Sequence, residues 1–251
     1  FSCVATYHQD HVLVLTNQDK RTITASNLFV DSKGIELVVG DRARIAAAHQ
    51  DGALLYDAKR FIGKRWSADA KDAEKTLPFA LEPRASKQRR QSEPHLAATL
   101  GDGPGQRLTL GPEEVGALIV ERLKATAEAA IGRAVDKAVL AVPVGFDANQ
   151  INATREAAEL AGFEVLRIIH EPTAAAMAYG LHNAGASMTV MVYDMGGGTL
   201  DVSLLNLNNG IFEVMSAAGD NRLGGQDFNL GLLQHLEAEV RRKMPAHDLD
   251  G

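Results

Sequence analysis

The chain has a single cysteine, Cys3, among its 251 residues, which excludes an internal disulfide framework and most zinc sites. No apolar run approaches the roughly 18 residues that suggest a membrane-spanning helix. The net charge of −6 predicts no general affinity for nucleic acid or for anionic membranes. The eight histidines form no cluster with metal-ligand spacing. What remains is a chain with 45% hydrophobic residues, enough for one large domain or two lobes.

Two common nucleotide-binding signatures are also missing. No G-x-G-x-x-G opens a helix and no G-x-x-x-x-G-K-[ST] occurs, which excludes the Rossmann and P-loop designs. The sequence has no initiator Met and no signal-like start, and Phe1 opens directly into strand-like sequence. We therefore expect a chain that is cut inside a structural element, so that a targeting segment would not show.

The most informative segment runs from Asp194 to Asp201 and reads Asp-Met-Gly-Gly-Gly-Thr-Leu-Asp between two apolar strands. Three glycines make a tight turn whose backbone N–H groups can converge on an anion. A carboxylate at each end and the Thr199 hydroxyl suit a phosphate bound to Mg²⁺, which takes oxygen ligands and keeps its waters. An ordinary glycine-rich hairpin is the alternative, and a triple glycine alone would favour it.

A strand pattern occurs twice. Three short strands are predicted over residues 2–7, 12–16 and 22–30, and again over 189–193, 200–207 and 211–217, about 190 residues later. In the second copy the glycine turn precedes the middle strand, and Asn208-Asn209-Gly210 predicts a hairpin turn. In the first copy the equivalent strand pair lacks its beginning.

Strands and helices alternate between these copies. A helix starts at Pro112, a strand covers 137–142, Asp147 caps a helix through Ala161, and a strand over 165–169 precedes a helix over 172–179. This order predicts parallel strands with right-handed crossovers. Residues 65–111 hold four of the eight prolines and a basic cluster, and we interpret much of this stretch as mobile subdomain surface: Lys87, Arg89 and Arg90. An amphipathic helix is predicted over 228–240.

Several longer motifs resemble one family, the DnaK-type heat-shock chaperones (heat shock protein 70 kDa). The motifs are Tyr-Asp-Ala-Lys-Arg-Phe-Ile-Gly at 56–63, His-Glu-Pro-Thr-Ala-Ala-Ala-Met-Ala-Tyr-Gly at 170–180, the glycine turn at 194–201, Ala-Gly-Asp at 218–220 and Leu-Gly-Gly-Gln-Asp-Phe at 223–228. Within the family the chain looks nearest to the microsomal ATPase-core members (Stch-type), which share the Gly-Gly-Gln-Asp-Phe-Asn run. The resemblance covers residues 1 to about 243.

The resemblance implies an α/β fold of the actin-like ATPase (ribonuclease H-like) type, with the first lobe nearly complete and the second lobe truncated. Residues 1–25 and 112–183 would form the core of lobe I (subdomain IA), without its first phosphate loop, and 26–111 subdomain IB. Residues 184–222 would form part of the core of lobe II (subdomain IIA), and 223–251 the start of subdomain IIB. The implied ligands are ATP or ADP with Mg²⁺.

The resemblance also implies roles for individual residues. Lys59 would orient the attacking water and offset charge on the γ-phosphate, although a surface lysine paired with Asp57 is the simpler alternative. The amides of Gly196, Gly197 and Gly198 with Thr199 would bind the γ-phosphate. Gly224 and Gly225, before a helix N-terminus, would also bind nucleotide. Glu171, Asp194 and Asp201 would hold Mg²⁺ through water, and the catalytic set would be Lys59, Glu171, Asp194 and Thr199.

The chain departs from the family pattern at several positions. His170 replaces the usual Asn and receives no catalytic role. Gln226 stands where most members have Glu, and Ile151 where the family has an Arg that relays nucleotide state to a peptide-binding domain. The first phosphate loop, a second glycine turn and a peptide-binding domain are not in the sequence. We therefore expect the 251 residues alone to hydrolyse ATP weakly or not at all. The Asn152-Ala153-Thr154 sequon lies in a predicted helix and is interpreted as a chance occurrence.

The sequence thus predicts the ATP-binding, ATP-hydrolysing region of a chaperone, in the short form without a peptide-binding domain. A nucleotide-gated binding module or a degenerate relative without turnover is the alternative, and a sugar kinase or actin-like filament protein is a third interpretation on the same fold. Expected partners are nucleotide, J-domain cochaperones, nucleotide exchange factors and unfolded polypeptide, with no nucleic acid and no membrane span. The expected compartment is the endoplasmic reticulum, with the cytoplasm as the alternative.

Overall fold

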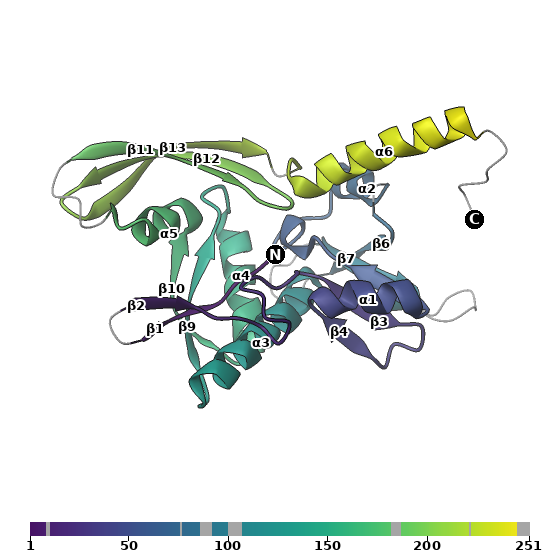
Figure 1. The fold of residues 1–251 in the computed structure, drawn as a ribbon, viewed down its shortest axis with the longest axis horizontal. Coiled ribbons are helices and arrows are strands. Elements are labelled where there is room, and N and C mark those ends of the chain that lie inside the picture. Colours follow the sequence, from purple (N-terminus) through teal and green to yellow (C-terminus); the bar gives the residue numbers. More distant parts are fainter. Residues whose placement is uncertain are drawn as a thin grey trace. The chain divides into compact units, whose positions relative to one another are not determined.

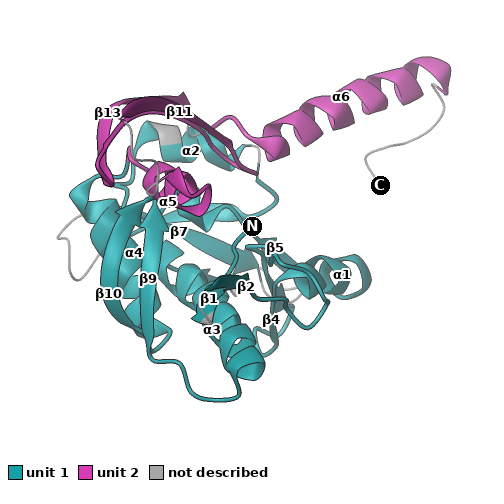
Figure 2. Cartoon of the chain, turned by 60° about the vertical axis from the view of Figure 1, so that its left-hand side comes forward, with its two compact units in different colours: residues 1–142, 146–170 teal, residues 143–145, 171–251 magenta. Residues whose placement is uncertain are grey.

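A computed structural model describes residues 1–8, 11–75, 77–85, 92–99, 107–181, 187–220 and 222–244. The described part is mixed α/β (Figure 1). It divides into two compact units, one of residues 1–142 and 146–170 and the other of 143–145 and 171–251 (Figure 2). None of the helices in the described ranges combines the length and the apolar run that crossing a bilayer requires.

Unit 1 contains four small sheets and four α-helices among its described residues. Its elements are β1 (Ala5–His8), β2 (His11–Val14), β3 (Leu28–Asp31), β4 (Leu37–Val39), α1 (Asp41–His49), β5 (Gly52–Leu55), the 3₁₀ turn η1 (Ala58–Arg60), α2 (Ala68–Glu74), β6 (Ala80–Ala85), β7 (Ser92–Thr99), β8 (Arg107–Leu110), α3 (Pro112–Ile131), β9 (Lys137–Val142), α4 (Ala148–Leu160) and β10 (Glu164–His170). The strand orders are β1-β2, β4-β3-β5, β6-β7-β8 and β10-β9.

The crossover predicted from the sequence is confirmed. Strands β9 and β10 pair in parallel, and α4 connects them. Asp147 caps α4, because its Oδ1 accepts a hydrogen bond from the Gln150 amide at 2.9 Å while Gln150 Oε1 accepts one from the Asp147 amide at 3.3 Å. This reciprocal cap satisfies amides that the first turn leaves without helical partners.

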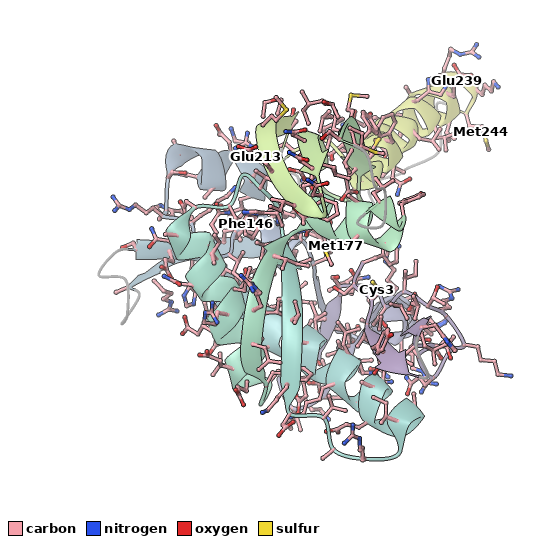
Figure 3. All side chains as sticks on the ribbon, turned by 90° about the vertical axis from the view of Figure 1, so that its left-hand side faces the viewer. Cys3, Phe146, Met177, Glu213, Glu239 and Met244 are labelled. Atoms are coloured by element: carbon pink, nitrogen blue, oxygen red, sulfur yellow. The ribbon has the colours of Figure 1, made fainter. Side chains whose placement is uncertain are left out.

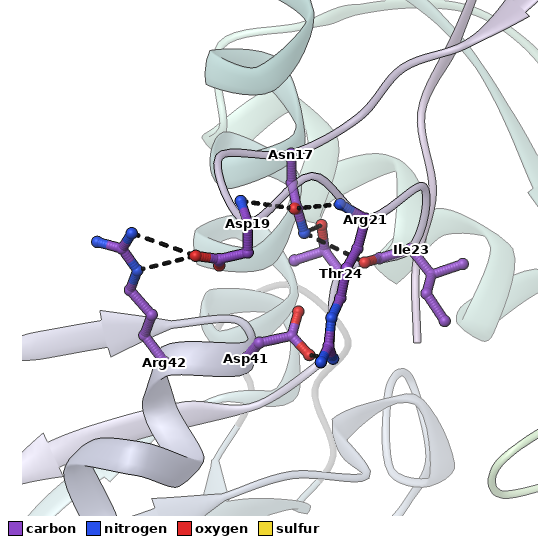
Figure 4. Close-up of polar contacts among 7 residues, drawn as sticks. All are labelled: Asn17, Asp19, Arg21, Ile23, Thr24, Asp41 and Arg42. Carbon is purple, nitrogen blue, oxygen red and sulfur yellow. Dashed lines mark hydrogen bonds and ion pairs between the residues drawn. The ribbon is translucent and has the colours of Figure 1, made fainter.

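The predicted third strand over residues 22–30 is wrong in its extent and pairing. Only 28–31 is a strand, β3, and it lies in a sheet with β4 and β5 rather than beside β1 and β2. The buried Asn17 explains the difference: its Oδ1 accepts from the amides of Asp19 and Arg21, and its Nδ2 donates to Ile23 O and Thr24 Oγ1 (Figure 4). These bonds hold residues 17–24 in a turn that returns the chain to Ser2, where Thr24 forms only an isolated antiparallel bridge before the chain continues to β3.

The interpretation of residues 65–111 as subdomain surface is wrong for the residues that the structure describes. This stretch forms α2, β6, β7 and β8, and it contributes buried side chains to the main core of unit 1: Phe79, Leu81, Leu96 and Ala98. The same core contains Leu28, Val30, Leu55 and Val115, none of which retains any exposed surface. The basic cluster of Lys87, Arg89 and Arg90 lies outside the described residues.

Unit 2 consists of α5 (Glu171–Ala178), β11 (Met188–Met195), β12 (Leu200–Asn208), β13 (Ile211–Asp220) and α6 (Gly225–Lys243). The strands form an antiparallel sheet in the order β11-β12-β13, which confirms the second predicted meander. Asn209 and Gly210 both have positive φ, as the predicted hairpin turn requires. The predicted amphipathic helix is present as α6, but it buries none of its residues.

Candidate functional site

In unit 1, Lys59 lies in the middle of η1, and its side chain is exposed. Ala58, Phe61 and Ile62 around it are buried, so the turn is fixed to the core by its apolar residues. Asp57 precedes η1 in the left-handed region, with φ of 58°, and its Oδ2 lies 3.4 Å from Arg60 Nε. Asp57 thus has Arg60 as one partner, and its pairing with Lys59 remains a prediction.

Gly63, which follows η1, packs closely against the start of α4. Its φ is +65°, and a Cβ at this position would lie 2.6 Å from Gln150 Cα and 2.7 Å from Asn149 O. No side chain fits in that space, so the backbone of the loop rests directly on the first turn of α4. The sequence analysis assigned no role to Gly63. The glycine ending the Asp-Ala-Lys-Arg-Phe-Ile-Gly run was the available signal, because an isolated glycine often marks a close backbone approach.

In unit 2, the two acidic residues that flank the glycine turn lie side by side. Asp194 on β11 and Asp201 on β12 are direct cross-strand partners in the antiparallel register. Residues opposite each other in such a pair have Cβ atoms about 5 Å apart, and like charges there are destabilising. A bound cation would remove this repulsion, and carboxylate oxygens are donors that Mg²⁺ accepts.

The described residues contain no group of three or more His, Cys, Asp or Glu side chains that could hold a metal ion. A fully protein-built cage is therefore not present in this part of the chain. The Asp194–Asp201 pair instead fits Mg²⁺ as it commonly binds in phosphate sites, where one or two carboxylates are supplemented by water and substrate phosphate. Glu171 opens α5 directly after β10, as predicted, and its carboxylate lies in the first turn of that helix.

The two glycine motifs of unit 2 meet through their backbones. The amides of Gly225 and Gln226 donate to the carbonyl oxygens of Gly196 and Gly197 at 3.0 and 2.8 Å. A Cβ at Gly224 would lie 2.5 Å from the Gly198 nitrogen and 2.6 Å from the Gly197 carbonyl carbon. The glycine turn and the start of α6 are thus joined by main-chain hydrogen bonds into one substructure, called here the glycine junction (residues 196–199 and 224–226).

Further hydrogen bonds stiffen the glycine junction. The Gly196 amide donates to Thr199 O at 2.9 Å, which closes the turn, and Asp227 Oδ2 accepts from the Gly224 amide at 2.8 Å, which caps α6. Sequence spacing did not show this junction, since it joins segments about 25 residues apart through main-chain atoms. Three amides in it, those of Gly196, Gly225 and Gln226, are engaged with protein carbonyls. The phosphate contacts expected of Gly196–Gly198, Thr199, Gly224 and Gly225 remain predictions.

The family described as Hsp70 protein matches residues 1–250. The chain belongs to the Hsp70 family. Similar proteins include heat shock 70 kDa protein BIP3 of Oryza sativa subsp. japonica, 41% identical over 245 residues, and the heat shock cognate HSP70 protein of Trypanosoma brucei brucei, 39% identical over 247 residues. A ribosome-associated molecular chaperone of Eremothecium gossypii is 40% identical over 247 residues.

Each of these alignments covers 97% of this Hsp70 chain but only 35%, 35% and 38% of the respective relative. The chain therefore spans about a third of the length of the curated relatives it matches. The family resemblance inferred from the motifs is confirmed. The residues predicted to act together are divided between the units: Lys59 belongs to unit 1, whereas Glu171, Asp194, Thr199 and Asp201 belong to unit 2. That they line one cavity remains a prediction.

Proposed function

We propose that this chain is the ATP-binding and ATP-hydrolysing region of an Hsp70-type chaperone, built on the actin-like ATPase fold. The proposed subdomains are those expected from the sequence: 1–25 with 112–183, 26–111, 184–222 and 223–251. The observation that carries the proposal is the glycine junction next to the Asp194–Asp201 pair, in a chain that matches the Hsp70 family throughout. Main-chain amides and paired carboxylates in one small region suit a metal-bound phosphate.

In the proposed reaction, water attacks the γ-phosphate of ATP, and ADP and phosphate are released. Lys59 would orient the water and stabilise the charge that develops on the γ-phosphate. Such a preorganised cation is often worth a factor of about 10² or more in rate. Amides of the glycine turn and the Thr199 hydroxyl would hold the γ-phosphate in line for attack. Mg²⁺, held through water by Glu171, Asp194 and Asp201, would neutralise phosphate charge.

The alternative function is a nucleotide-gated binding module without turnover. At Ile151 we propose that coupling to a peptide-binding domain is lost or unnecessary, because an apolar side chain cannot make the charge-assisted contact by which an Arg would relay nucleotide state. For partners we propose J-domain cochaperones, nucleotide exchange factors and unfolded polypeptide. For the compartment we propose the endoplasmic reticulum, on the motif kinship with the microsomal members, with the cytoplasm as the alternative.

Calorimetric binding of MgATP and phosphate release, measured together on the full-length gene product, test this proposal. Lys59→Ala should lower the hydrolysis rate about 10²-fold with little change in nucleotide affinity. Asp201→Asn should weaken Mg²⁺-dependent binding. Lys71→Ala, which removes an exposed lysine from α2, is the matched control and should change neither quantity.

Nucleotide binding without any phosphate release by the unmodified protein would favour the binding module instead. Turnover by the 251 residues alone at the rate of an intact family member would contradict the expectation for the isolated chain.

A further inference from the structure

Lys59 lies in a short segment that begins and ends with a residue in the left-handed region. Asp57 has φ of 58° and Gly63 has φ of +65°, with η1 between them, and residues 57–63 are called here the Lys59 turn. A left-handed backbone is uncommon, and outside glycine it persists only where the surrounding structure imposes it. Two such residues so close together indicate that the backbone around Lys59 is held in one specific shape.

Contacts within unit 1 hold the Lys59 turn in this shape. The Arg60 amide donates to Asp57 O at 2.8 Å, and Asp57 Oδ2 lies 3.4 Å from Arg60 Nε. Ile62 packs with Ala153 and Ala157 of α4 in a second apolar cluster. The lysine between these anchors is exposed, so the packing fixes its backbone and leaves its side chain at the surface.

Gly63 fixes the far end of the Lys59 turn by direct backbone contact. A Cβ at this position would lie 2.6 Å from Gln150 Cα and 2.7 Å from Gln150 N. These are main-chain atoms in the first turn of α4, so they cannot rotate away as a flexible side chain could. An added methyl group must therefore displace the turn, and a misplacement of about 1 Å at a reacting group can cost about 10²-fold in rate.

We propose that Asp57 and Gly63 are positioning residues for Lys59. Their left-handed backbones, one joined to Arg60 and the other seated on α4, place the lysine amine for hydrolysis, and they act through Lys59 alone. This inference rests on the proposed function, in which Lys59 stabilises charge on the γ-phosphate. Because that charge develops in the transition state, a misplaced lysine should lower the hydrolysis rate with little change in MgATP affinity.

A double-mutant cycle with Lys59→Ala tests the proposal, measured as single-turnover phosphate release by the full-length gene product at saturating MgATP. Gly63→Ala should lower the rate about tenfold or more. The same change in a Lys59→Ala background should alter the rate by less than about twofold, since no amine remains to be misplaced. Equal factors in the two backgrounds would overturn the proposal, because a general loosening of the fold lowers the rate whether or not the lysine is present.

Gly132→Ala is the matched control for backbone strain. Gly132 follows α3 in unit 1 with φ of +76°, so alanine meets a similar strain there, but nothing lies within 4 Å of the added Cβ. This variant should lose stability and keep a hydrolysis rate within about twofold of the unmodified protein. A rate loss as large as that of Gly63→Ala would overturn the proposal, because strain rather than contact with α4 would then be the cause.

Asp57→Gly gives a second test that does not require the Gly63→Ala protein to fold. Glycine adopts the left-handed backbone without strain, but it removes the ion pair with Arg60 and loosens the turn. The rate should fall about threefold, the value of a modest ion pair, and only when Lys59 is present. No fall, or an equal fall in the Lys59→Ala background, would overturn the role of Asp57.

Failure of the proposed function gives a different result in the same experiment. The unmodified protein would then release no phosphate, or Lys59→Ala would release it at the unmodified rate, and the positioning role would be overturned together with the proposed function. A slow Lys59→Ala protein in which Gly63→Ala lowers the rate by its full factor would refute the positioning role alone.

Discussion

Unit 1 and unit 2 differ in what holds them together. Unit 1 has a large apolar core in which Leu28, Val30, Leu55 and Val115 retain no exposed surface. Unit 2 buries few apolar side chains among its described residues, and the apolar residues of α6 are largely exposed: Phe228 at 60% and Leu232 at 58%. Figure 3 shows the side chains of α6 standing out along the helix as far as Glu239 and Met244. Unit 1 is therefore organised by apolar packing, and unit 2 by main-chain hydrogen bonds.

This difference bears on the candidate site, because most of its predicted residues lie in unit 2. Without a large core, the geometry of the Asp194–Asp201 pair depends on the sheet ladder and the glycine junction. Segments with few buried apolar contacts open at a lower free energy than core segments. We therefore expect unit 2, which contains the residues predicted to bind phosphate, to be less stable than unit 1, which holds Lys59.

The largest expected change in the free energy of unfolding comes from removing the buried side chain of Phe29 in unit 1, with the exposed Phe228 of unit 2 as the comparison. Phe29→Ala should lower the free energy of unfolding of unit 1 by about 3–5 kcal/mol, since it leaves a cavity in a close-packed core. Phe228→Ala, on the exposed face of α6, should change stability by less than about 0.5 kcal/mol. Urea unfolding followed by hydrogen exchange at residues of both units gives the two values. Similar losses in the two variants would show that unit 2 has a core like that of unit 1.

A smaller effect is expected at the two close backbone approaches. Gly224→Ala would place a Cβ 2.5 Å from the Gly198 nitrogen and should destabilise the glycine junction by about 1–3 kcal/mol. The measurement is hydrogen exchange of the Gly225 and Gln226 amides, which should become faster. Gly231→Ala in the same helix meets nothing within 4 Å and should stabilise α6 by about 0.5–1 kcal/mol.

Gly63→Ala makes the corresponding change in unit 1, where φ of +65° adds strain to the clash with α4. It should speed exchange around η1 and leave the Gly225 and Gln226 amides unchanged. If the Gly225 and Gln226 amides exchange at the unmodified rate in Gly224→Ala, the glycine junction accommodates the added Cβ without loss of stability.

Local features of the fold were predictable from the sequence and distant ones were not. The cap at Asp147, the β9–α4–β10 crossover and the Asn209-Gly210 turn depend on short-range chemistry, and all three are confirmed. The third strand was placed wrongly because Asn17 turns the chain through four side-chain hydrogen bonds. The strands within 65–111 were missed because prolines and charges concealed residues that are buried by partners far away in sequence.

The candidate site shows the same limit. The residue types of the glycine turn and the two aspartates indicate phosphate and Mg²⁺ chemistry, which remains a prediction. The pairing of Asp194 with Asp201 follows from the hairpin register, which a sequence pattern also indicates. The contacts of Gly224 with the turn and of Gly63 with α4 were not predictable, because an isolated glycine can signal a close backbone approach but does not show which distant backbone it meets.

The smallest expected effect concerns ion pairs under acid. Hydrogen bonds from Arg107 and then Arg84 hold the pKa of Glu82 below its usual range, and the bond from Arg107 connects strands β6 and β8 of unit 1. Arg242 and Lys243 lower the pKa of Glu239 in the same way, but only within one helix of unit 2. A carboxylate whose pKa is lowered on folding adds stability above its unfolded pKa, and this stability is lost as the pH falls through the folded value.

Glu82→Gln should therefore cost unit 1 a few tenths of a kcal/mol at neutral pH, the usual value of a partly exposed pair, and nothing at a pH below the folded pKa of Glu82. Glu239→Gln should lower the helicity of α6 at neutral pH and leave the unfolding of unit 1 unchanged. Urea unfolding of both variants and the parent, repeated at neutral and acidic pH, measures the difference. A Glu82→Gln loss that persists in acid would show that the Glu82 side chain acts through packing rather than charge. Glu82 would then stabilise unit 1 in the same way as its apolar core residues, by packing.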